Sequence, residues 1–456
     1  ILKVTKLTEV CLIWNEQEQL KDVKQELKKI TEFDKTINMP KKITYLLRDG
    51  LDKAKSLDCD AFVFDTPDSE DAIIYELEFF KPQHIVGTLN SDDVSSFSVW
   101  EKAREYAESM YLFGWGIDKP SEILAWTKRD IELSVILPMY NIAKYLPKCI
   151  ETVTAWKAPY IEFLFVDDGS PDNCAEIVQE YAKNDNRIKL LTKENGGCAS
   201  ARQYGMDRAQ GTYIGFIDPD DYIDPTMYKK LLSRAMQGSY EISHCGFNFL
   251  YENTGEIVQV EDNIGYPYCN GVTDAAKVRE LMASLRVAIW RGIYLRSRIE
   301  QSKISFYTDL PRFDDLPFKV EIYSSARSVV SISEYLYYYR LAREGQDVAA
   351  DDQRLYVHFD IFKHLDTHMS SRKKFTDQTR GLIQLCKVHT HKYALTKIRK
   401  EFFNEYCIKA KADMFNVISY KDTVAEIKKL GSKNDIAFVH AIEKGKFGAV
   451  KKLASK

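Results

Sequence analysis

The chain has 456 residues, and its 45% hydrophobic and 29% charged residues are typical of globular proteins. This length predicts two to four domains, and the composition excludes a chain that is disordered throughout. No apolar run reaches the roughly 18 residues that a membrane-spanning helix needs. Nine cysteines are scattered without a C-x-x-C pair, which is typical of reduced thiols, so we expect a cytoplasmic protein.

The net charge of −3 is unevenly distributed along the chain. Residues 351–456 carry a net charge of +10, and the first 350 residues carry −13. Three interpretations of the basic segment stay open: a solvated face of a helical domain, peripheral contact with the inner face of a membrane, or contact with an anionic polymeric acceptor. Nucleic acid is not expected as a partner, because no nucleic-acid-binding motif is present.

Residues 1–117 alternate between the two hydrophobic periodicities. Apolar segments of strand length are separated by segments with helical spacing, the former at 7–14, 61–64, 84–89 and 111–115, the latter at 20–30, 71–80 and 94–110. This alternation predicts a small accessory α/β domain with a parallel or mixed sheet. It contains neither a G-x-G-x-x-G nor a P-loop motif, so we assign it no chemistry. Residues 118–132 are interpreted as a connector.

A second α/β unit is predicted over residues 131–346. Four nearly continuous apolar strands alternate with helical segments, with strands at 133–138, 161–166, 188–191 and 212–217. Such strands are typical of a parallel sheet that is covered on both faces, and ligands bind at the carboxyl ends of its strands. From 353 to 456 the spacing of apolar residues is mostly helical, which predicts a helical, basic C-terminal region.

Polar residues follow each of the four predicted strands. The segments are Pro138-Met139-Tyr140-Asn141, Asp167-Asp168-Gly169-Ser170, Glu194-Asn195-Gly196-Gly197 and Asp218-Pro219-Asp220-Asp221. Each one alone has the composition of an ordinary turn. Four of them at one edge of a parallel sheet favour a binding site instead.

The fourth segment, which follows the strand predicted at 212–217, has the composition of a cation site. Asp218, Asp220 and Asp221 lie within four residues, and packed carboxylates raise one another's pKa unless a cation neutralises them. Oxygen ligands suit Mg²⁺ or Mn²⁺, which protein carboxylates hold together with substrate phosphates. We therefore predict Asp220 and Asp221 as metal ligands. A solvated acidic turn is the alternative.

These segments resemble a known family. SVILPMYN, FLFVDDGSPD and NGGCASARQYGMDRAQGTYIGFIDPDDYIDP are similar to the nucleotide-binding half of family 2 glycosyltransferases, which have the GT-A fold. The resemblance implies an α/β GT-A domain with a Rossmann-like mixed sheet and a nucleotide-sugar donor, usually UDP-linked. It implies the following nucleotide-binding residues: Pro138, Tyr140, Asn141, Asp167, Asp168, Gly196, Gly197, Arg202, Asp218 and Asp220.

The resemblance continues to about residue 346. Asp314-Asp315 is similar to the family's Glu-Asp pair, whose Asp is the general base, so Asp315 is the implied catalytic residue and Asp314 stands where Glu is usual. Arg291-Gly292 departs from the family's Asn-Lys after the tryptophan. The resemblance places on the acceptor side Trp290, Asp314, Tyr339 and Arg340.

The sequence thus favours a metal-dependent, inverting glycosyltransferase. A carboxylate base on the attacking side and Mn²⁺ or Mg²⁺ on the leaving side imply direct displacement. The expected acceptor is a hydroxyl of a glycan, a cell-surface polymer or a glycoprotein. The departures at Arg291, Gly292 and Asp314 keep open a catalytically inactive glycan-binding or scaffold module. Nucleotidyl transfer is disfavoured. It usually needs a loop rich in glycine and basic residues after the first strand, and the segment PMYNIAKYL does not supply one.

Overall fold

The computed structural model describes the backbone of six strands before Ile131 and, from Ile131 to Ser455, all residues except 263, 266, 342–349 and 372–375. Contacts between residues divide the chain into two units, residues 1–130 with 233–239 and residues 131–232 with 240–456. The helices expected at 20–30, 71–80 and 94–110 lie outside the described residues. In the parts described, no helix is long and apolar enough to cross a membrane.

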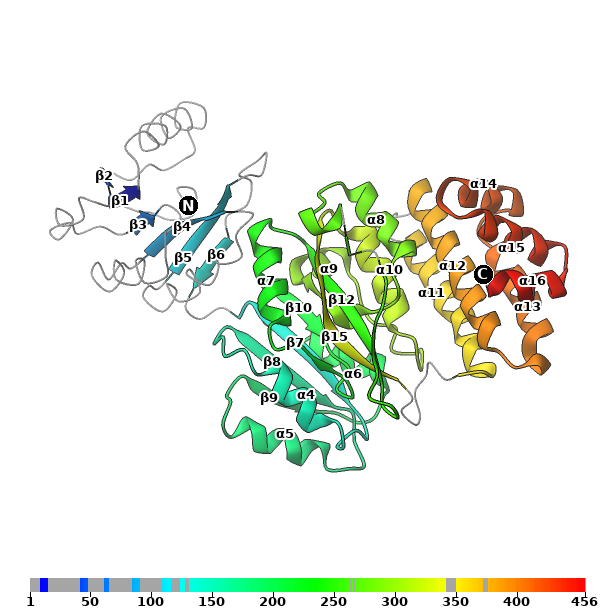
Figure 1. Cartoon of the computed structure of the whole chain (residues 1–456), viewed down its shortest axis with the longest axis horizontal. Coiled ribbons are helices and arrows are strands. Elements are labelled where there is room, and N and C mark those ends of the chain that lie inside the picture. The colour runs from blue at the N-terminus through cyan, green and yellow to red at the C-terminus, as the bar shows by residue number, and fades with distance from the viewer. Residues whose placement is uncertain are drawn as a thin grey trace. The chain divides into compact units, whose positions relative to one another are not determined.

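The N-terminal unit contains a six-stranded sheet of order β2-β1-β3-β4-β5-β6 (Figure 1). Its strands are β1 (Glu9–Trp14), β2 (Lys42–Leu47), β3 (Ala61–Phe64), β4 (His84–Asn90), β5 (Ser109–Trp115) and β6 (Leu124–Thr127). All neighbours are parallel except β5 and β6. The predicted mixed sheet is confirmed. The segment interpreted as a connector contains β6. This strand pairs with β5 and forms one edge of the sheet.

The second unit is built on a mixed sheet of order β11-β15-β12-β14-β10-β7-β8-β9, with β13 paired to β12. Its parallel half contains β7 (Leu133–Met139), β8 (Ile161–Asp167), β9 (Ile188–Thr192) and β10 (Tyr213–Phe216). The other strands are β11 (Tyr222–Ile223), β12 (Ile242–Tyr251), β13 (Ile257–Gln259), β14 (Gly292–Leu295) and β15 (Val329–Leu341). Every residue of β7 and β8 is buried, which confirms the prediction of strands covered on both faces.

Helices cover this sheet closely. They are α4 (Leu146–Val153), α5 (Cys174–Ala182), α6 (Cys198–Met206), α7 (Met227–Gln237), α8 (Ala275–Ser284), α9 (Arg296–Ser302) and α10 (Asp315–Ser325). A Cβ at Gly205 of α6 would lie 2.6 Å from Ile136 of β7, so only glycine lets the helix lie this close. Close packing here fixes the distance between α6 and the carboxyl ends of the strands.

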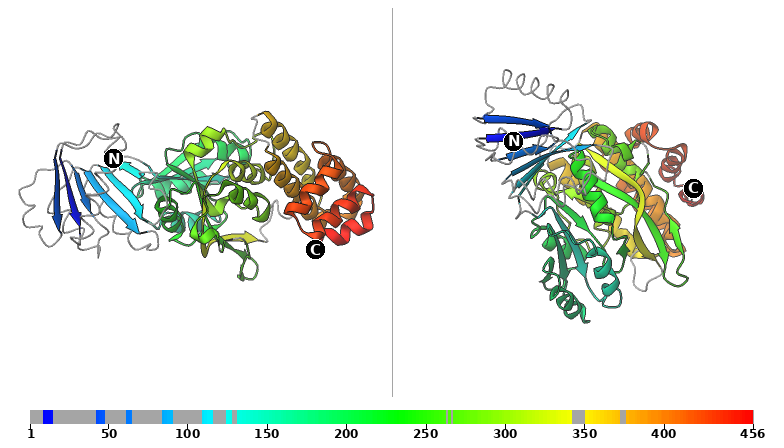
Figure 2. Two further views of the ribbon diagram at one scale, coloured as in Figure 1. Left: turned by 90° about the horizontal axis from the view of Figure 1, so that it is seen from above. Right: turned by 60° about the vertical axis from the view of Figure 1, so that its left-hand side comes forward.

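The C-terminal part is helical, as predicted, and the views of Figure 2 show its helices side by side. They are α11 (Val357–Ser371), α12 (Asp377–Lys397), α13 (Lys400–Met414), α14 (Tyr420–Leu430), α15 (Lys433–Glu443) and α16 (Phe447–Ala454). Ile361 of α11 and Leu382 of α12 share one hydrophobic core with α10. A second hydrophobic core is shared by the five helices α12 through α16. It contains Tyr406, Phe438 and Val450.

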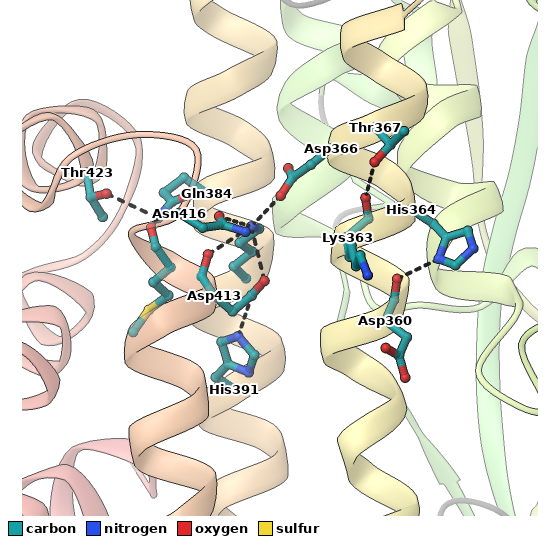
Figure 3. Close-up of polar contacts among 12 residues, drawn as sticks. Asp360, Lys363, His364, Asp366, Thr367, Gln384, His391, Asp413, Asn416 and Thr423 are labelled. Atoms are coloured by element: carbon teal, nitrogen blue, oxygen red, sulfur yellow. Dashed lines mark hydrogen bonds and ion pairs between the residues drawn. The ribbon is translucent and has the colours of Figure 1, made fainter.

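A buried polar network connects α11, α12 and α13 (Figure 3). The Lys387 ammonium donates to Asp366 at 2.8 Å and lies 3.3 Å from Asp413. The imidazole of His391, which is fully buried, lies 2.9 Å from Asp413 and 3.1 Å from the hydroxyl of Tyr406. Each charge is compensated by a partner from another helix, so the network specifies how the three helices align.

We predict that Lys387→Met destabilises the protein by about 3–5 kcal/mol, because Asp366 would stay buried without its cation and Asp413 would lose one of its two partners. Urea denaturation followed by circular dichroism measures the change. Lys397→Met on the same helix is the control and should cost less than about 1 kcal/mol, because Lys397 is exposed. Equal destabilisation by the two variants would contradict this role for Lys387.

Candidate active site

The carboxyl ends of the parallel strands meet at one edge of the sheet. Met139 of β7 pairs with Asp167 of β8, and Asp167 pairs with Thr192 of β9. The Asp168 amide donates to the Met139 carbonyl at 2.9 Å, and the Lys193 amide donates to the Asp167 carbonyl at 3.0 Å. The structure therefore brings three of the four predicted segments into direct contact.

Asp168 holds the glycine segment in place. Its carboxylate accepts hydrogen bonds from the amide of Gly197 at 2.7 Å, the amide of Gly196 at 3.0 Å and the ammonium of Lys193 at 2.6 Å. Gly197 has a φ of 85°, a conformation that favours glycine. Lys193, which the sequence reasoning missed, directly follows the third strand. That position is the signal that could have identified it.

Asp167 keeps part of its hydrogen-bonding capacity. One carboxylate oxygen accepts from the Ser170 amide at 3.0 Å, and the other accepts no hydrogen bond from the described residues. Tyr140, at the end of β7, is 51% exposed, and Asn141 has a φ of 55°, a conformation that Asn tolerates better than most residues. These residues can therefore contact a ligand at the edge of the sheet.

Strand β15 braces the Asp218–Asp221 segment. The Asp221 carboxylate accepts from the hydroxyl of Tyr337 at 2.8 Å and from the amide of Arg340 at 2.7 Å. The Arg340 guanidinium donates to the Asp220 carbonyl at 2.7 Å. Burial, followed by the charges of Asp220 and Asp218, raises the pKa of Asp221 well above its usual value.

The carboxylates fit a divalent cation. Burial and the charge of Asp220 raise the pKa of Asp218, although Arg202 opposes the shift, so a cation here would offset excess negative charge. Among the described residues, no three His, Cys, Asp or Glu side chains form a metal site. Mg²⁺ and Mn²⁺ are commonly held by one or two carboxylates with substrate phosphates, and Asp218 and Asp220 match that pattern.

Arg202 of α6 connects the two acidic clusters. Its guanidinium pairs with Asp218, directly after β10, and donates to Asp314, immediately before α10, at 2.6 Å. Arg202 is 4% exposed, and its Nε has no partner among the described residues. Asp314, placed on the acceptor side from the sequence, is therefore an internal partner of Arg202 in this structure.

Asp315 begins α10 beside this ion pair. Phe313 has a φ of 57°, a strained conformation for an aromatic residue, and it orients the two carboxylates that follow. Burial, then the negative charge of Asp314, raises the pKa of Asp315 to about 7, although Arg202 opposes the shift. A carboxylate that titrates near neutrality is suited to accept a proton.

Aromatic rings line the neighbouring part of β15. Trp290 is 5% exposed and stacks on Tyr337 and Tyr339, with ring centroids 4.1 and 5.2 Å apart. Stacking on Trp290 therefore holds the rings of both tyrosines in place. Arg291 forms a buried ion pair with Asp262 at 2.9 Å, which explains an arginine at a position that departs from the expected motif.

Comparisons with known proteins show which family this part of the chain is similar to. Residues 134–289 match the family model described as Glycosyl transferase family 2. The chain is 34% identical over 214 residues to the uncharacterized glycosyltransferase EpsJ of Bacillus subtilis, which covers 46% of this chain and 60% of EpsJ. It is 30% identical over 212 residues to the uncharacterized glycosyltransferase YibD of Escherichia coli, covering 46% and 61% of the two chains.

The chain thus spans about three fifths of the length of these curated relatives. Among solved structures, S. aureus TarS 1-349 in complex with UDP-GlcNAc is similar, with a TM-score of 0.54 and 18% identity. That match covers 71% of this chain and 90% of the TarS chain. The likeness shows the fold, and it confirms the GT-A architecture that the sequence predicted.

We predict that Arg202→Gln destabilises the protein by about 3–5 kcal/mol, because Asp314 would stay buried without its cation. Urea denaturation measures the change. The control is Arg208→Gln, which lies just past the same helix and is exposed. Adding Asp314→Asn to Arg202→Gln removes the uncompensated charge and should restore part of the stability. Similar stability of the two single variants would contradict the bridging role.

Proposed function

We propose that the chain is an inverting glycosyltransferase that transfers a sugar from a UDP-linked donor to a hydroxyl group. The observation that carries the proposal is the Arg202 bridge, which connects donor-side Asp218 to Asp314, the neighbour of a carboxylate with a pKa of about 7. Enzymatic activity is consistent with the family match and with the glycosyltransferase names of EpsJ and YibD. The UDP-GlcNAc complex of TarS supports a uridine donor.

In this proposal the nucleoside lies between the ends of β7 and β8. Asp167 accepts hydrogen bonds from the base or ribose through its remaining oxygen, and Tyr140 and Asn141 cover the opposite side. Asp168 acts on the donor through Gly196 and Gly197, whose amides it holds in place. The glycine segment is consequently preorganised before the donor binds.

Asp218 and Asp220 would hold Mn²⁺ or Mg²⁺ together with the diphosphate, and the cation would offset charge on the leaving group. Asp221, which the sequence predicted as a metal ligand together with Asp220, has a structural role in this proposal instead, because both of its oxygens accept hydrogen bonds from β15. Arg340 keeps the Asp220 segment in place through its guanidinium. This assignment moves Arg340 from the acceptor to the donor side of the site.

Asp315 is the proposed base. Its carboxylate takes the proton from the acceptor hydroxyl as the oxygen attacks the anomeric carbon and the bond to the diphosphate breaks. Attack opposite the leaving group inverts the configuration. Tyr339, whose side chain is partly buried, is the proposed contact to the acceptor. Burial, then the charges of Asp221, Asp218 and Asp220, raises its pKa, so its hydroxyl stays protonated and can donate a hydrogen bond.

We further propose three domains: residues 1–117 as an accessory domain, 131–346 as the catalytic domain and 353–456 as a basic helical region. The acceptor is a glycan, a cell-surface polymer or a glycoprotein. A cytoplasmic location fits the use of a nucleotide sugar and the described cysteines, none of which forms a disulfide.

UDP is predicted to stabilise the protein in the presence of Mn²⁺ and to do so less in EDTA, because the cation bridges the carboxylates and the diphosphate. At 100 times its dissociation constant the ligand should add about 2.7 kcal/mol, which is a rise in Tm of several degrees. A thermal-shift panel of UDP, GDP, CDP and ADP measures this. Asp220→Asn should remove the metal dependence. A folded sample that no nucleotide stabilises would favour the inactive glycan-binding module.

Asp315→Asn is predicted to reduce transfer by about 10²–10⁴-fold while UDP still binds, because the base is lost and the donor site remains. Transfer by the wild type should rise with pH and level off above about 7, since only ionised Asp315 accepts the proton. The control is Glu280→Gln, which removes an exposed carboxylate from α8. Wild-type transfer by Asp315→Asn would exclude Asp315 as the base.

Stability gives a second readout of the same residue. Because the folded-state pKa of Asp315 lies above the model value of 3.8, its ionisation costs the fold stability as pH rises from about 4 to about 7. Asp315→Asn removes this cost. The variant should therefore gain stability relative to the wild type between pH 5 and pH 8, a change that Glu280→Gln should not show.

A further inference from the structure

The C-terminal helices carry a cluster of lysines at one junction. Lys428 and Lys429 lie in the last turn of α14, Lys433 begins α15, and Lys451 and Lys452 lie in the last turn of α16. The side-chain amide of Asn434 donates to the backbone carbonyl of Leu453 at 3.0 Å. The start of α15 and the end of α16 are therefore in contact. We call these five residues the lysine junction.

The lysine junction is exposed and mostly uncompensated. All five side chains are exposed. Lys429 pairs with Glu426 at 2.8 Å, whereas the other four form no ion pair among the described residues. The nearest buried acid, Asp435, is already used: it accepts from Ser432 at the start of α15 and from Lys392 at 2.9 Å. Positive charge at this junction is therefore available to a partner.

Helix stability explains only part of the junction. Lysines in the last turns of α14 and α16 interact favourably with the partial negative charge at helix C-termini. Lys433 has the opposite placement, since it is the first residue of α15, where the helix dipole disfavours a cation. The helix dipoles therefore account for the lysines at the ends of α14 and α16 and not for Lys433.

The surroundings favour a polymer over a membrane. A helix that lies in a membrane interface inserts exposed bulky apolar side chains beside its lysines. Among the described residues, none of the exposed large hydrophobic side chains lies between Ser419 and Ser455. Phe438, Ile442 and Val450 face the core instead. Leu430, Phe447 and Leu453, the larger apolar side chains beside the lysines, are partly buried against the same core. The surface therefore offers charge with little exposed apolar area, which suits a hydrated polyanion.

We propose that the lysine junction binds an anionic polymeric acceptor, a glycan chain carrying phosphodiester or carboxylate groups, and keeps it bound during transfer. The inference rests on the proposed function, because it identifies the acceptor class for the same reaction. Several lysines that engage successive anionic groups release counterions, so binding should weaken steeply with salt. Neutral glycans of the same length should not engage the junction.

The test measures binding of full-length protein to long-chain polyphosphate, oligogalacturonate, neutral dextran and vesicles of phosphatidylcholine with phosphatidylglycerol, without donor. The test variant combines Lys428→Gln, Lys433→Gln, Lys451→Gln and Lys452→Gln. The matched control combines Lys157→Gln, Lys183→Gln, Lys277→Gln and Lys303→Gln, which removes the same charge from exposed positions of the catalytic domain.

The test variant should bind the preferred polyanion at least about tenfold more weakly, with a shallower dependence on salt, while the control stays within about twofold of the wild type. The stronger of the polyphosphate and galacturonate signals identifies the anionic group. Equal weakening by both variants, or junction-dependent binding to vesicles alone, would overturn the inference. The UDP thermal shift of the test variant should equal that of the wild type, so absence of any UDP shift counts against the proposed function separately.

Discussion

One buried guanidinium determines how the acidic residues of this site are arranged. Arg202 comes from α6, and its two carboxylate partners come from the end of β10 and the start of α10. A buried charge is tolerated only where partners replace its lost hydration, so the three elements must meet at this side chain. Arg202 and Gly205 lie on the same helix, and the absence of a side chain at Gly205 lets that helix pack directly against Ile136 of β7. The helix that packs against the sheet is thus the same helix that carries the cation between the acidic residues.

The same arrangement gives two adjacent carboxylates different environments. Asp314 is buried and paired with Arg202, whereas Asp315 forms no ion pair among the described residues and titrates near pH 7. In many enzymes two nearby carboxylates lie in different environments, and this difference gives them different roles. In the Asp218–Asp221 segment, the Asp221 carboxylate accepts two hydrogen bonds from β15, and Asp218 pairs with Arg202. Both acidic clusters thus contain a carboxylate that is held by neighbouring elements.

The sequence predicted the parts of this structure that depend on local pattern. The apolar runs at 133–138 and 161–166 became fully buried strands, and the turn residues after them lie at one edge. Pairings across long separations could not be predicted, because no periodicity reports them: Arg202 and Asp314 are 112 residues apart. Lys387 shows the same limit. A lysine in a helical pattern is expected on the solvated face, yet here two carboxylates from other helices compensate its burial.

The chain has an acidic part, residues 1–350, and a basic part, residues 351–456. The proposed function gives a reason for this difference in charge. In the proposed function, the carboxylates of Asp167, Asp218, Asp220 and Asp315 would repel an anionic acceptor, and this repulsion would be long-ranged at low salt. A chain of several anionic groups can reach the site only if favourable contacts elsewhere exceed this cost. In our proposal the exposed lysines of α14, α15 and α16 would supply such contacts away from the acidic residues of the site. Binding of the acceptor and the transfer reaction would then be carried out by separate parts of the chain.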